Sequence, residues 1–213
     1  MRTTITCVAF LVCLVAGGWR LTEGYKVWTS DEARAYAVEL VPRQLPSIHL
    51  IDTLGQQFAL NDLTQTGQKI VVLDFFFTRC LTVCSALGTR FQQLQTEIKT
   101  RGLQDRVALL SISFDPVHDT SRALAEYAER MQVDASIWSI AAFANATDSS
   151  VALRAFDVVV IPDPLLLYQH NAALHLLNTN GELARILDYA FADSLLDLAL
   201  VQPPISIKKE VSL

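Results

Sequence analysis

The sequence lacks a basic cluster, an internal repeat and a low-complexity tract, and each absence excludes a class of protein. Its 213 residues include 17 lysines and arginines against 22 aspartates and glutamates, a formal net charge of −5, and the basic residues form no cluster. Nucleic-acid-binding domains carry a basic patch for the phosphates, so we expect no nucleic-acid partner. The sequence also contains no internal repeat and no low-complexity tract, and 51% of its residues are apolar. This length and composition predict one globular domain with an N-terminal extension.

Cysteine is scarce, with four residues in the whole chain. Cys7 and Cys13 fall in an apolar N-terminal run, whereas Cys80 and Cys84 fall inside the expected domain. Only the second pair can therefore form a working site in the folded body.

The apolar run at the N-terminus, residues 5–18, is short for a membrane-spanning helix. A spanning helix needs about 20 apolar residues, and a positive start before a shorter run is typical of a secretory signal. Small residues at 16–18 offer a cleavage site, and Cys13 lacks the preceding small residue expected of a lipidated cysteine. We predict export, to the periplasm in a bacterium, by a cleaved signal or an uncleaved inner-membrane anchor. A buried N-terminal helix is the alternative that these flanks favour least.

The chain divides by composition into four parts. Residues 1–18 are the signal or anchor, 19–44 a linker with a short helix, 45–201 the domain and 202–213 a flexible tail. Within the domain, apolar periodicity predicts strands alternating with helices, followed by a closing hairpin and a last helix. The expected strands are 48–51 and 57–60 as a hairpin, 71–77, 107–114, 137–140, 158–161, 172–177 and 182–186, and the expected helices are 30–41, 86–100, one after 119–121, 148–156 and 191–201. The pattern predicts a three-layer α/β domain.

The cysteine pair follows the first long strand of this domain. Cys80 lies in the turn after the strand, and Cys84 lies about one helical turn further along. Residues four apart on a helix have Cβ atoms roughly 5–6 Å apart, which is wide for a disulfide and suits two thiolates on one ion. The helix N-terminus and the neighbouring Arg79 favour the thiolate form. Soft thiolates suit Cu(I), zinc or iron–sulfur clusters, and two cysteines need a third ligand from elsewhere.

Three motifs follow one another along the chain. Residues 75–84 read Phe-Phe-Phe-Thr-Arg-Cys-Leu-Thr-Val-Cys, residues 113–120 read Ser-Phe-Asp-Pro-Val-His-Asp-Thr, and residues 168–181 carry a histidine before a strand and a Gly turn. In this order they resemble the motifs of the Sco/SenC family, and the resemblance covers about residues 45–200. It implies a thioredoxin-like fold and a copper site formed by Cys80, Cys84 and His170. It also implies delivery of Cu(I) or Cu(II) to the dicopper centre of cytochrome c oxidase subunit II.

The other histidines and Asp115 are interpreted without a role as metal ligands. His49 and His175 lie on expected strands and are expected to be structural, and His118 lies in a polar loop where it is solvated or contacts a partner. Asp115 either orients the site or caps the next helix.

The sequence departs from the family pattern at three places. Leu81 and Ser85 stand where the family has proline, and Gln169 replaces the acidic residue before the histidine. A carboxylate there would raise the basicity of the imidazole and fix its tautomer, so we expect weaker copper binding than in a typical member.

Other functions remain open at this point. A thiol–disulfide oxidoreductase acting on the copper receiver would need Cys80 and Cys84 but not His170. A peroxide-reducing thiol enzyme and a redox-sensing binding module are further alternatives, and the flanking Thr78 and Arg79 do not favour the peroxidase. Other copper chaperones or thiol reductants are possible partners, and the N-terminus offers membrane association.

Overall fold

The computed structural model describes residues 2–64, 69–80, 83–189 and 195–200. Within them, a seven-stranded sheet has the order β2-β1-β5-β4-β3-β8-β9, and β6 and β7 form a separate two-stranded sheet. The strands are β1 (His49–Asp52), β2 (Gln57–Ala59), β3 (Ile70–Phe76), β4 (Val107–Ser113), β5 (Trp138–Phe143), β6 (Val160–Asp163), β7 (Leu167–His170), β8 (Ala173–Leu177) and β9 (Leu183–Asp188). The helices are α1 (Arg2–Leu21), α2 (Ser30–Leu40), η1 (Leu60–Leu63), α3 (Val83–Thr100), α4 (Ser121–Arg130), α5 (Ala146–Ala155) and α6 (Leu195–Leu200).

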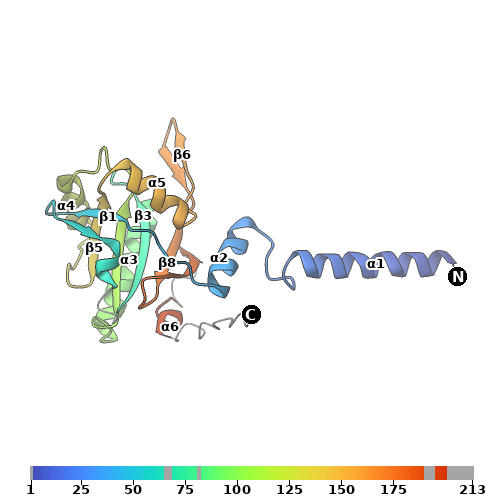
Figure 1. Cartoon of the computed structure of the whole chain (residues 1–213). Coiled ribbons are helices and arrows are strands. Elements are labelled where there is room, and N and C mark those ends of the chain that lie inside the picture. Colours follow the sequence, from blue (N-terminus) through green and yellow to red (C-terminus); the bar gives the residue numbers. More distant parts are fainter. Residues whose placement is uncertain (1, 65–68, 81–82, 190–194, 201–213) are drawn as a thin grey trace, which may run out of the picture.

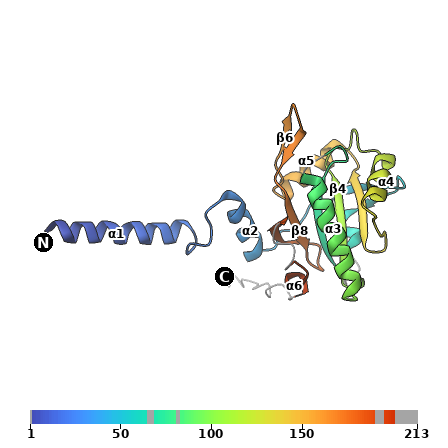
Figure 2. The same ribbon diagram turned by 180° about the vertical axis from the view of Figure 1, so that it is seen from behind.

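Helices cover both faces of the large sheet, as the alternating pattern predicted. Strands β3, β4 and β5 are parallel, and α3 and α4 connect them on one face (Figure 2). Helix α5 lies on the other face (Figure 1), and α2 packs against the edge strand β9. Strand β8 returns antiparallel to β3, which places the C-terminal half of the chain beside the cysteine strand.

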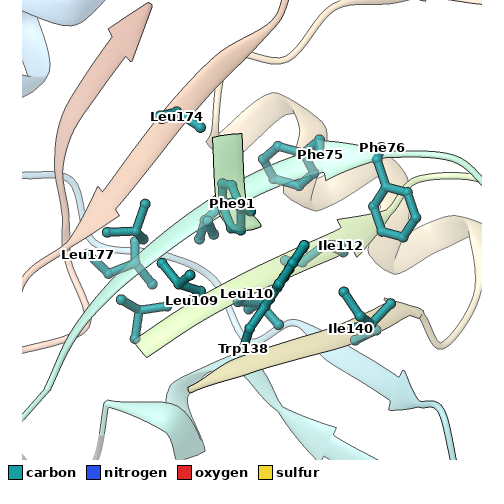
Figure 3. Packing of buried hydrophobic residues seen from close by; sticks show 14 of the residues in the cluster. Phe75, Phe76, Phe91, Leu109, Leu110, Ile112, Trp138, Ile140, Leu174 and Leu177 are labelled. Carbon is teal, nitrogen blue, oxygen red and sulfur yellow. The ribbon is translucent and has the colours of Figure 1, made fainter. Parts of the chain in front are cut away.

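The core is centred on the three parallel strands (Figure 3). Phe91 of α3 packs on Trp138 of β5, and Phe76 of β3 packs on Tyr127 of α4. Strand β3 is buried over nearly its whole length, so the residues that follow it start from a rigid position.

Helix α2 begins where its capping signal predicted. The Thr29 side chain accepts from the backbone N–H of Glu32, and the Glu32 carboxylate accepts from the backbone N–H of Thr29. This reciprocal capping box satisfies two N–H groups that have no partner within the helix.

Helix α1 is an exposed apolar helix that continues beyond the expected run to Leu21. The segment Thr4–Leu21 is long and apolar enough to cross a membrane, and a signal sequence would have the same properties.

The structure corrects three expectations. Helix α3 begins at Val83, so Cys80 lies before the helix and the four-residue helical spacing does not apply to the pair. Strand β6 runs from Val160 to Asp163, later than the strand expected at 158–161, and it pairs with β7 in a hairpin that the sequence did not predict. His49 is an exposed residue 3.6 Å from Asp148 rather than one among apolar neighbours. The start and end of the helix expected at 191–201 lie outside the described residues.

Candidate metal centre

Cys80 lies in the turn that follows strand β3. Its backbone N–H donates to the Phe77 carbonyl at 3.2 Å, and its half-buried side chain packs against the hydrophobic core. The backbone of Cys84 lies in the first turn of α3. The side chain of Cys84 lies outside the described residues, as do Leu81 and the side chain of Ser85.

The loop after β4 holds this cysteine turn in place. The buried Asp119 accepts hydrogen bonds from the backbone N–H of Thr78 at 2.8 Å and from its hydroxyl at 2.5 Å. The hydroxyl of Ser113 donates to the same carboxylate at 2.5 Å. The residues of the second motif therefore fix the backbone two positions before Cys80.

Asp115 orients this region and does not cap a helix. Its buried carboxylate accepts from Arg79 at 3.0 Å, and the ring Nδ1 of His118 lies 2.8 Å away from it. Thr120 caps α4 instead. Because Arg79 is engaged by Asp115, part of its positive charge is neutralised, and its support for a Cys80 thiolate is smaller than the sequence predicted.

An aromatic cluster of Phe77, Phe114 and Tyr168 connects the cysteine turn to His170. The Tyr168 ring lies 5.3 Å from that of Phe77 and 5.7 Å from that of Phe114, between ring centroids. The His170 ring packs edge-on against Phe114 at 5.2 Å. The turn of Cys80, which is hydrogen-bonded to Phe77, and the His170 ring therefore both border this packed cluster.

The surroundings of His170 suit a neutral imidazole. Partial burial lowers the pKa of His170, while a contact of its Nδ1 with the Asn171 carbonyl at 3.2 Å opposes that shift. When Nδ1–H donates to this carbonyl, the lone pair resides on Nε2, the form in which histidine binds a metal. The imidazole therefore fits a site for a copper ion in its protonation state and tautomer.

His175 is not beside His170. It is buried in the core as expected, where its Nε2 lies 3.1 Å from the Phe156 carbonyl and burial lowers its pKa to about 4. Gln169, next to His170, donates its side-chain amide to Asp163 across the hairpin. Among the residues that the structure describes, no group of three histidine, cysteine or acidic side chains is arranged to hold a metal ion. That description does not include the Cys84 side chain, so the set of Cys80, Cys84 and His170 stays a prediction.

Residues 44–196 match the family model described as SCO1/SenC. The chain belongs to this family. Members of the Sco family bind copper and take part in cytochrome c oxidase assembly.

Individual Sco proteins are distant in sequence and similar in fold. The SCO1 protein homolog of Bacillus subtilis is 23% identical over 119 residues, which are 55% of this chain and 61% of that protein. A SCO1/SenC family lipoprotein from Bacillus anthracis superposes with a TM-score of 0.66 at 22% identity, over 75% of this chain and 94% of the other. ScoI of Arabidopsis thaliana, whose structure contains copper, gives a TM-score of 0.61 at 21% identity over 71% and 92%.

Sequence reasoning missed the residues that support His170. Asp157 and Asn171 bond to each other at the base of the β6–β7 hairpin, and Arg43, from the segment after α2, forms an ion pair with Asp157. No local sequence pattern predicts these contacts, since Arg43 and Asp157 are far apart in the sequence.

Proposed function

We propose that this Sco protein is a copper metallochaperone that holds the ion with Cys80, Cys84 and His170. The observation that supports it best is the aromatic cluster, which brings the His170 ring to the end of the sheet that carries Cys80. Two thiolates stabilise Cu(I), and an imidazole helps the same site accept Cu(II). Copper is the cargo here, and three ligands leave a coordination position that a receiver's ligand can enter.

The test is copper binding by the full chain in detergent. Wild-type protein is expected to develop the visible thiolate-to-Cu(II) charge-transfer band on titration. His170→Ala and Cys80→Ser are expected to lose tight Cu(II) binding, measured against a competing chelator. His49→Ala is the matched control, because His49 is an exposed histidine on β1 and should leave the titration unchanged. An unchanged affinity in His170→Ala would contradict the proposed ligand set.

A thiol–disulfide oxidoreductase is the second candidate. It is favoured by the position of Cys80 at the end of a buried strand and by the disulfide switch identified in the relative BsSco. This activity uses the cysteines alone. His170→Ala with full disulfide exchange and no copper binding would support the chaperone with an accessory thiol activity. If His170→Ala retains both properties, the oxidoreductase is the better description.

The same proposal includes the protein that receives the copper and the cellular location of the chain. We infer that the chain delivers copper to cytochrome c oxidase subunit II, or to another copper-receiving protein, at the outer face of the inner membrane. Helix α1 supports this location, because a signal or an anchor would bring the domain there. Transfer of copper from the loaded chain to the soluble domain of subunit II, followed by the spectrum of the dicopper centre, tests the receiver.

A further inference from the structure

The β6–β7 hairpin that carries His170 contacts the rest of the domain through the aromatic cluster and at its base. Within the described part of the chain it pairs with no strand of the large sheet, and Ile161 in β6 and Leu165 and Leu166 at its tip are exposed. Figure 1 shows the hairpin projecting from the domain. An isolated two-stranded hairpin is marginally stable in water, so the position of His170 depends on the aromatic cluster and on what holds the base of the hairpin.

Asn171 ties the two ends of the hairpin together. Its side-chain oxygen accepts from the backbone N–H of Val159 at 2.7 Å, and its side-chain N–H donates to the Asp157 carbonyl at 3.2 Å. Its own carbonyl contacts the His170 ring. One residue therefore links the start of the hairpin, the end of the hairpin and the imidazole.

Two arginines from the N-terminal side of the domain hold Asp157. Arg34 of α2 donates to the Asp157 carbonyl at 3.1 Å. Arg43 donates to the Ala155 carbonyl at 2.7 Å and lies 2.9 Å from the Asp157 carboxylate, an ion pair that is not aligned as a hydrogen bond. Asp157 has a positive φ of 56° just after α5, a left-handed conformation that aspartate adopts more often than most other residues besides glycine.

Arg43 is itself fixed to the sheet. Its backbone N–H donates to the Leu183 carbonyl at 2.8 Å, and its carbonyl accepts from the Leu183 N–H at 2.9 Å. The segment after α2 is thereby paired with β9, and its side chain reaches from there to the end of α5. These contacts form a continuous connection from a rigid strand to the base of the hairpin.

We propose that Arg34, Arg43, Asp157 and Asn171, here termed the hairpin latch, are positioning residues for His170. The proposal rests on the proposed function, since His170 matters as a copper ligand. Arg34 and Arg43 come from the segment between α1 and the sheet, so this segment helps to position a ligand of the metal centre. Outer partners that orient a ligating histidine typically change metal affinity by about 10–100-fold when they are removed.

The experiment compares Arg43→Ala, Asn171→Ala and the conservative Arg43→Lys in the full chain in detergent. The two alanine variants are expected to weaken Cu(II) binding about tenfold, whereas Cu(I), held mainly by thiolates, should change by less than about threefold. Arg43→Lys keeps the ion pair and should recover part of the loss. Arg122→Ala is the matched control, since Arg122 is an exposed arginine paired with Glu126 on α4. Thermal unfolding of each variant accounts for changes in stability.

A second measurement separates this proposal from the proposed function. NMR relaxation of the His170 ring in the copper-free chain reports its order directly, and the ring is expected to become more mobile in Arg43→Ala and Asn171→Ala. If the wild type binds no copper but the ring loosens in these variants, the proposed function fails and the latch stands. If Cu(II) affinity and ring order in both variants equal those of the wild type, the latch is refuted, whatever their melting temperatures.

Discussion

At the scale of single residues, the buried Asp74 is the least expected feature of the Sco domain. It lies in β3 at 0% exposure, opposite Ser111 of β4, and burial raises its pKa to about 7 although Ser111 partly opposes the shift. Neither carboxylate oxygen has a hydrogen bond with good geometry, so the effect of Ser111 is that of a nearby hydroxyl. Ser111 already accepts from the Trp138 indole at 3.0 Å.

Asp74 should make the protein less stable as the pH rises. The unfolded carboxyl loses its proton near pH 3.9 and the folded one near pH 7, so the unfolding free energy falls between these values by up to about 4 kcal/mol. Asp74→Asn removes this loss, and its stability relative to wild type should be greater at pH 8 than at pH 5. Urea unfolding at both pH values measures the difference.

The opposing titration of His175 does not disturb this comparison. Its lowered pKa removes stability as the pH falls from about 6.5 to 4, and both proteins retain it. An equal stability difference at pH 5 and pH 8 would show that Asp74 is ionised in the folded protein throughout.

At the scale of elements, the loop between β4 and α4 is a clamp on the cysteine turn. Asp119→Ala leaves the Thr78 N–H, the Thr78 hydroxyl and the Ser113 hydroxyl without their acceptor. An unsatisfied buried donor costs about 1–3 kcal/mol, so this variant should lose at least about 2 kcal/mol of unfolding free energy. In a background with Cys7, Cys13 and Cys84 all replaced by serine, the alkylation rate of Cys80 should also change, because the turn before Cys80 is released.

Asp105→Ala provides the comparison for the clamp. Asp105 is exposed, and its removal changes the net charge by the same amount without touching the turn. Equal stability of the two variants would mean that the clamp contributes nothing measurable to the fold.

Some of the elements could be predicted from the sequence, and others could not. Strands β3 and β4 and helix α3 were predictable because buried strands and an amphipathic helix leave clear periods. The β6–β7 hairpin could not be predicted, since Pro162 lies within a strand and the exposed leucines give no apolar period that would mark a buried face. Proline occurs in such an edge strand because it cannot donate to a ladder. For the site, the resemblance named Cys80 and His170, but the latch joins Arg43 to Asp157 through contacts that only folding creates.

At the scale of the whole molecule, the connection between α1 and α2 sets how far the domain can lie from α1. Helix α1 ends at Leu21 and α2 begins at Ser30, so the connecting residues 22–29 can span no more than about 30 Å. If α1 stays in the membrane, the domain is confined to a layer within about 30 Å of the membrane surface.

We expect α1 to be an uncleaved anchor, because its 20 helical residues match the hydrocarbon thickness of a bilayer at 1.5 Å per residue. The chain should then remain in the membrane fraction after alkaline carbonate washing and dissolve only in detergent. Its intact mass should include residues 1–18. Replacing Val12 in the middle of α1 with arginine should release the chain, whereas Val12→Leu should not. A soluble product whose mass begins after residue 18 would identify the segment as a cleaved signal.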